Sequence, residues 1–154
     1  MSLEKLHLEV SALEQHITNH HLANLKISQG TIGWHIDHSL KVINNVSLAL
    51  KTSDPETYKN NFTFLGKVFF ALGFFPRGKA KAPQLVRPPE IILKTDLLSQ
   101  LDLAKTNINA LSNADKNAYF KHPLFGHINS TRVYRFLAMH THHHIKIIND
   151  IMDA

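Results

Sequence analysis

The sequence predicts an all-α fold, and three observations favour it. Apolar residues recur at spacings of three and four along several long segments. No segment shows a convincing strand pattern, and one long Pro-rich segment separates the expected helices as a crossover. The 154 residues suffice for one hydrophobic core, so we expect a single domain over residues 1–154.

The first two predicted helices cover residues 3–19 and about 32–50. Apolar residues of the first helix recur at helical spacing, at Leu6, Val10, Leu13 and Ile17. A polar break at residues 28–31 separates the two helices, and Ser28 or Thr31 supplies the cap of the second. The second helix has its own stripe along one face, formed by Ile32, His35, Ser39, Val42, Val46 and Ala49.

The third predicted segment is rich in phenylalanine and begins at Asp54-Pro55, a cap followed by a first-turn proline. Its end is weakened by Gly73. Residues 76–90 contain four prolines and are expected to form an irregular crossover. A fourth helix then fits residues 95–111, with one apolar face.

The final third of the chain is predicted to form a loop and a long helix. Residues 119–129 are interpreted as a structured loop with a turn near Gly126. The last helix begins after Ser130 and extends to about Met152. With this helix, the prediction is a chain of long helices and no strand.

Composition excludes several functional classes. The chain has no cysteine, which excludes disulfides, thiolate metal ligands and a nucleophilic cysteine. Its first residues do not form a signal peptide, and its longest apolar stretch, residues 62–75, is shorter than the about 20 residues that cross a bilayer. We therefore expect a cytoplasmic protein with no membrane partner. The net charge is +5, and one basic loop contains four of the positive residues: Arg77, Lys79, Lys81 and Arg87. This loop supports nucleic-acid binding only weakly.

Histidines on the last predicted helix suggest a metal site. Six residues of this helix share the face that turns toward the core: Val133, Leu137, His140, His144, Ile147 and Ile151. His140 and His144 lie one turn apart at positions where aliphatic residues are expected, and histidines at this spacing are able to share one metal ion. Unsatisfied buried polar groups cost roughly 1–3 kcal/mol each, and one shared cation satisfies both rings.

A third ligand is expected from the second predicted helix, whose stripe contains His35. His38 falls nearer the edge of that stripe and is the second choice. We therefore predict that His35, His140 and His144 bind a divalent metal ion. Three neutral imidazoles with one open position are typical of zinc or nickel, with iron as a further option.

The alternative for each of these histidines is structural, as a core residue hydrogen-bonded within the protein and without an ion. His142 and His143 point away from the paired histidines, because successive residues turn about 100° around the helix, and are expected at the surface. His122 and His127 flank residues 123–126, which favours a turn over a role in a site.

Three motifs, in this order along the chain, resemble the DinB-like (YfiT-like) superfamily: Gly33-Trp34-His35-Ile36-Asp37-His38, His122-Pro123-Leu124-Phe125-Gly126 and His140-Thr141-His142-His143-His144. The resemblance covers nearly the whole chain in the order of its elements. It implies an antiparallel four-helix bundle, to which the Phe-rich segment and the Pro-rich crossover are additions, and a homodimer. It also implies a three-histidine metal site on the positions that match the family's ligands, His35, His140 and His144.

The resemblance suggests two functions. The first is a metal-dependent enzyme, a thiol transferase or hydrolase, acting on a small molecule with a low-molecular-weight thiol as cosubstrate. The alternative is a non-catalytic binding or stress-related module whose metal site is structural or vestigial. The sequence assigns no catalytic residue. We expect no nucleic-acid partner.

Overall fold

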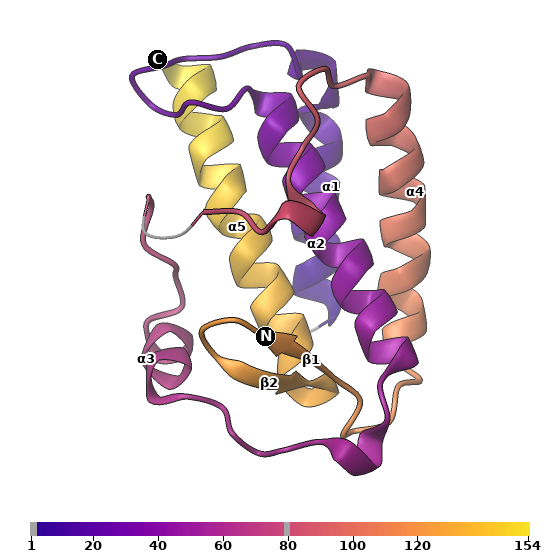
Figure 1. The fold of residues 1–154 in the computed structure, drawn as a ribbon. Coiled ribbons are helices and arrows are strands. Elements are labelled where there is room, and N and C mark those ends of the chain that lie inside the picture. The colour runs from indigo at the N-terminus through magenta and orange to yellow at the C-terminus, as the bar shows by residue number, and fades with distance from the viewer. Residues whose placement is uncertain (1–2, 79–80) are drawn as a thin grey trace.

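The computed structural model describes residues 3–78 and 81–154 and is mainly helical (Figure 1). Five α-helices and one two-stranded sheet lie within these residues. Lys79 of the predicted basic loop falls outside them. No helix in these two ranges is both long and apolar enough to cross a membrane.

Helices α1 (Leu3–Gln15) and α2 (Ile32–Thr52) lie close to their predicted positions. α1 ends earlier than predicted, and a separate 3₁₀ turn follows at Ile17–Asn19. The hydroxyl of Thr31 accepts a hydrogen bond from the backbone N–H of Trp34 at 3.0 Å and so caps α2. Of the two predicted caps, the structure uses Thr31.

Helix α3 (Phe64–Leu72) begins later than predicted. Asp54-Pro55 starts only a 3₁₀ turn at Pro55–Thr57. The hydroxyl of Thr63 caps α3 by accepting from the N–H of Gly66, and the helix ends at Gly73 in a left-handed conformation with φ 74°.

The late start of α3 has a tertiary cause, because two backbone N–H groups of residues 58–63 donate to a distant part of the chain. The N–H of Lys59 donates to Nδ1 of His127 at 3.0 Å, and the N–H of Thr63 donates to the carbonyl of Phe125 at 3.0 Å. These bonds hold the segment extended alongside residues 125–127 and replace the helical bonds that Pro55 would otherwise begin.

The Pro-rich crossover contains one 3₁₀ turn, Gln84–Val86, and leads into α4 (Lys94–Leu111). Residues 119–129 form a β-hairpin instead of the predicted loop, so the expectation of no strand was wrong. Strand β1 (Tyr119–His122) pairs antiparallel with β2 (Gly126–Asn129). The predicted turn is present, and Gly126 adopts the left-handed φ of 76° that it requires.

Helix α5 (Ser130–Asp153) follows the hairpin directly. It packs against α1 and α2, and α4 packs against α2 and α1, so the four long helices enclose one core (Figure 1). The fully buried side chains of that core are aliphatic and include Leu6, Leu13, Ile36, Leu40, Ile43, Leu97, Leu101, Ile108 and Leu137. This arrangement brings α2 and α5 into contact, which positions the predicted histidines.

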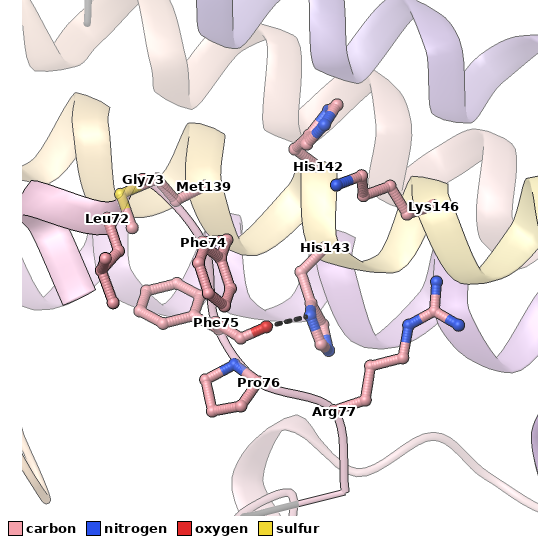
Figure 2. A pocket seen from close by; sticks show the side chains of 10 residues that line it. All are labelled: Leu72, Gly73, Phe74, Phe75, Pro76, Arg77, Met139, His142, His143 and Lys146. Carbon is pink, nitrogen blue, oxygen red and sulfur yellow. Dashed lines mark hydrogen bonds between the residues drawn. The ribbon is translucent and has the colours of Figure 1, made fainter.

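The segment that follows α3 runs along α5 and borders a half-open cavity of about 450 Å³ (Figure 2). Nδ1 of His143 donates to the backbone carbonyl of Phe75 at 3.0 Å and ties this segment to α5. The side chains of Arg77 and Lys146 also line the cavity. Arg77 is paired with Asp150 at 2.7 Å, so its charge is partly compensated there.

Candidate metal centre

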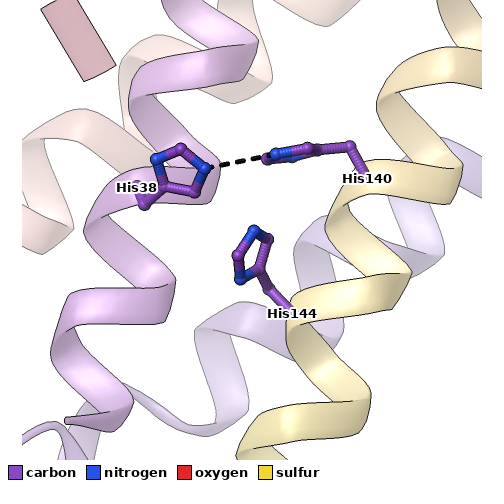
Figure 3. Close-up of side chains that lie close together, drawn as sticks. All are labelled: His38, His140 and His144. Atoms are coloured by element: carbon purple, nitrogen blue, oxygen red, sulfur yellow. Dashed lines mark hydrogen bonds between the residues drawn. The ribbon is translucent and has the colours of Figure 1, made fainter. Parts of the chain in front are cut away.

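Helices α2 and α5 direct three histidines toward one point: His38 from α2, and His140 and His144 from α5 (Figure 3). Each histidine offers one ring nitrogen to this group, and the three nitrogens all lie within 4.8 Å of one another. Nε2 of His38 and Nε2 of His140 lie 3.2 Å apart. The rings of His140 and His144, one helical turn apart, have centroids separated by 4.8 Å.

The core-facing stripe of α5 is present as predicted. Its aliphatic members, Val133, Leu137, Ile147 and Ile151, are all buried, and His144 is buried with them. His140 retains some exposed surface, although its Nδ1 atom is shielded from solvent. The periodicity of the sequence therefore placed this pair on the correct side of the helix.

His35, the predicted third ligand, lies beside this group of three rather than within it. Its Nδ1 is hydrogen-bonded to Nδ1 of His144 at 2.9 Å, and its Nε2 is hydrogen-bonded to the hydroxyl of Ser28 at 2.9 Å. The predicted second choice, His38, lies level with His140 and His144. Both α2 histidines are buried and face α5, so they differ mainly in their level along the helix.

Hydrogen bonding fixes which nitrogen of His38 is available. A carbonyl oxygen only accepts, so the bond of 2.8 Å between Nδ1 of His38 and the carbonyl of Val86 places the proton on Nδ1. Nε2 of His38 then carries a lone pair and points toward His140. Val86 belongs to the crossover, and the ring of Trp34 stacks on His38 with centroids 5.2 Å apart. This support for His38 comes from a backbone carbonyl, which leaves no signal in the sequence.

His144 also has an available nitrogen, whereas the nitrogen of His140 that faces His38 is Nε2. Nδ1 of His144 is taken by His35, which leaves Nε2 of His144 available. When His144 donates this bond, His35 in turn donates to Ser28 through Nε2, and Nε2 of His144 carries a lone pair. Nδ1 of His140 is buried and has no hydrogen-bond partner among the described residues. The protein alone therefore leaves the cluster incompletely satisfied.

All of these imidazoles are weak bases. Burial, and then the neighbouring histidines, hold the pKa of His140 and the pKa of His144 well below the usual 6.5. Burial also lowers the pKa of His38 and, with an added effect of His38, lowers the pKa of His35 to about 4. The four rings are neutral at pH 7, the state in which histidine binds a metal ion.

Four other histidines make contacts outside this cluster. His142, which was expected at the surface, is half-exposed and lies 3.2 Å from the carboxylate of Glu9. His143 lines the cavity beside α3. His122 accepts hydrogen bonds within the hairpin turn, and the backbone N–H of His127 donates to Asn61 in the neighbouring segment. Both therefore have the structural role that their positions around a turn predicted.

Comparisons with known proteins add no identification: no family model, curated protein or solved structure matches this chain. The resemblance to the DinB-like superfamily therefore has no support beyond the motifs themselves.

Proposed function

We propose that this protein binds one divalent metal ion through His38, His140 and His144 and leaves a fourth position open. The observation that carries the proposal is the convergence of three neutral imidazoles from two helices on one point. In a tetrahedral site with metal–nitrogen bonds of 2.0–2.1 Å, two ligand nitrogens lie roughly 3.3–3.4 Å apart. The 3.2 Å between Nε2 of His38 and Nε2 of His140 matches that distance.

The donor set favours a chemical role for the ion. Three neutral ligands leave the full positive charge of the ion uncompensated, and three protein ligands with an open position are the pattern of catalytic zinc sites. Such an ion lowers the pKa of a bound water or thiol and supplies a nucleophile at neutral pH. Zinc or nickel suits three imidazoles, and iron is a further option. We therefore propose a thiol transferase or hydrolase.

The cavity of about 450 Å³ between α5 and the segment that follows α3 is the proposed place for a small-molecule substrate. Its lining residues on α5, Met139, His142, His143 and Lys146, lie next to the metal ligands in sequence, on an adjacent face of the same helix. Arg77 and Lys146 at one side and phenylalanines at the other favour a substrate with an acidic group and an apolar body.

The DinB-like bundle is part of this proposal. It is supported by the packing of α2 against α4 and α5 and of α1 against α5, and by the proximity of His140 and His144 to His38. The geometry favours His38 over His35 as the third ligand. The homodimer stays a prediction.

A second candidate is a non-catalytic module with a structural histidine cluster. It is favoured by the hydrogen bonds that join His35 to His144 and His38 to His140, which give these ring nitrogens partners within the protein. This candidate predicts that metal removal changes neither activity nor binding, and that no thiol cosubstrate is turned over.

The experiment is a calorimetric titration of chelator-treated protein with zinc, followed by elemental analysis. We expect one site in the wild type, and His38→Ala or His140→Ala is expected to abolish it. His35→Ala removes only a hydrogen bond to a ligand and is expected to lower affinity by about 10- to 100-fold while one site remains. His21→Ala, at an exposed position, is the matched control.

Each outcome distinguishes between ligand sets. If His35→Ala abolishes the site and His38→Ala leaves it, the set predicted from the sequence is correct and the geometric one is wrong. If all three variants bind zinc like the wild type, no metal centre exists at this cluster. A screen of the zinc- and nickel-loaded protein with thiol cosubstrates then separates the enzyme from the structural module.

A further inference from the structure

A second cavity, of about 370 Å³, lies between α3 and the first turns of α5, and contains none of the metal-centre histidines. This cavity is shallow and open to solvent. Three of its lining residues are cationic and the others are apolar; together they are Phe62, Lys67, Phe70, Ala71, Arg132 and Arg135. We call Lys67, Arg132 and Arg135 the basic cluster.

The basic cluster lacks carboxylate partners. No ion pair within the described part of the chain includes any of its three residues, and no acidic residue lines the cavity. The sequence contains no Asp or Glu between Glu56 and Glu90, so α3 and its flanking segments supply none. Three positive charges therefore face one cavity without local compensation.

The position of Arg132 and Arg135 on α5 makes the electrostatics of the basic cluster still less favourable. Both lie in the first two turns of the helix, where the backbone N–H groups already create positive potential, and no acidic residue is present in the first turn. Arg132 and Arg135 are also three residues apart, a spacing at which like charges destabilise a helix. An anion bound between them would remove both penalties.

Aromatic and backbone contacts hold the two guanidinium groups in place. The guanidinium carbon of Arg132 lies 4.7 Å from the centre of the Phe62 ring, and that of Arg135 lies 5.8 Å from the centre of the Phe70 ring. Arg135 also donates to the carbonyl of Phe70. Its Nε atom is buried and has no acceptor among the described residues, so this side chain has an unused hydrogen-bond donor.

We propose that the basic cluster binds the phosphate group of a phosphate monoester. A phosphate monoester carries a charge of about −1.5 to −2 at neutral pH and three acceptor oxygens, which match three cations better than a single carboxylate does. Guanidinium groups bind such oxygens in pairs, and Lys67 adds a point charge from the opposite helix. The site is independent of the metal centre.

Two sources present this group: a soluble phosphate ester and the headgroup of an anionic lipid. The lipid source is considered because α3 also exposes apolar side chains beside Lys67: Phe64 is 82% exposed and Leu65 is 43% exposed. The experiment therefore has two arms, one with phenyl phosphate in solution and one with vesicles that contain phosphatidic acid.

The test is a titration of chelator-treated protein at low salt, by calorimetry for phenyl phosphate and by cosedimentation for vesicles. We expect saturable binding in at least one arm. Arg132→Gln and Arg135→Gln are each expected to weaken it by about tenfold to a hundredfold. Arg87→Gln, an exposed charge on the crossover, changes the net charge equally and is expected to change affinity by less than about twofold.

Two further variants control for misfolding and for residual metal. Lys67→Gln alters an exposed side chain and tests the site even if an arginine variant fails to fold. His38→Ala is expected to bind phenyl phosphate or vesicles like the wild type, because His38 does not line the second cavity. Loss of binding in this variant would show that the phosphate binds to a residual metal ion. Absence of saturable binding in both arms, or equal losses in Arg87→Gln and Arg132→Gln, would overturn the proposal.

Discussion

Acid should destabilise the β-hairpin through His122, and one substitution isolates the effect. Burial lowers the pKa of His122 to about 4. Its Nδ1 accepts hydrogen bonds from the backbone N–H groups of Leu124 and Phe125, both at 3.1 Å, so protonation of Nδ1 removes both bonds. The folded state therefore favours the neutral ring, whereas the unfolded chain takes up a proton near pH 6.5.

The sign and size of the effect follow from these two pKa values. Stability is complete above pH 6.5 and is lost as the pH falls toward 4, because the unfolded state binds the proton first. A folded pKa of about 4 corresponds to a loss of about 2 kcal/mol between pH 8 and pH 5 from this residue alone. Other buried histidines add to the loss in the same direction.

His122→Asn keeps an acceptor oxygen for the two N–H groups and cannot titrate. It removes the ring that stacks on Phe125 with centroids 4.2 Å apart, at a cost of about 1 kcal/mol at pH 8. At pH 5 the wild type has lost about 2 kcal/mol through this site and the variant has not, so the order of stability reverses.

Urea unfolding followed by circular dichroism at pH 8, 6.5 and 5, with chelator present, measures both effects. His21→Asn, at an exposed position, is expected to follow the wild type at every pH. If His122→Asn and the wild type lose equal stability between pH 8 and pH 5, the hairpin does not hold His122 in its neutral form and the reasoning is refuted.

Two other predictions concern the metal centre and the hairpin turn. Zinc at about 100 times its dissociation constant is expected to raise the unfolding free energy by about 2.7 kcal/mol and the Tm by roughly 5–11 °C, and an unchanged melting curve would contradict the metal centre. Gly126→Ala is expected to cost about 2 kcal/mol or more by urea unfolding, because φ is 76° and the new Cβ would lie 2.5 Å from the carbonyl oxygen of Asn61. Gly78→Ala has a similar φ of 69°, but no described residue other than its chain neighbours lies within 4 Å of the new Cβ, so it is expected to cost less. Equal losses in the two variants would show that the contact with Asn61 is unimportant.

The sequence by itself determined the features that depend on periodicity along one helix. The alternation of four and three residues along α5 placed His140 and His144 together on the buried face, because a helix repeats every 3.6 residues whatever packs against it. The positions of α2 and α4 followed from the same rule to within a few residues. The absence of cysteine likewise excluded thiolate sulfur from the candidate metal ligands.

Tertiary structure decided whatever depends on the relation between two segments. Which α2 histidine lies level with the α5 pair depends on how the two helices are shifted along each other, and side-chain packing sets that shift. The carbonyl of Val86, which orients His38, arrives from a distant crossover. The hairpin also needs its two strands and residues 58–63 to meet, since strands of four residues carry too short a pattern to be recognised alone. The structure groups His38 rather than His35 with the α5 pair for this reason: periodicity gives the face of a helix that a residue occupies, but not its level relative to a neighbouring helix.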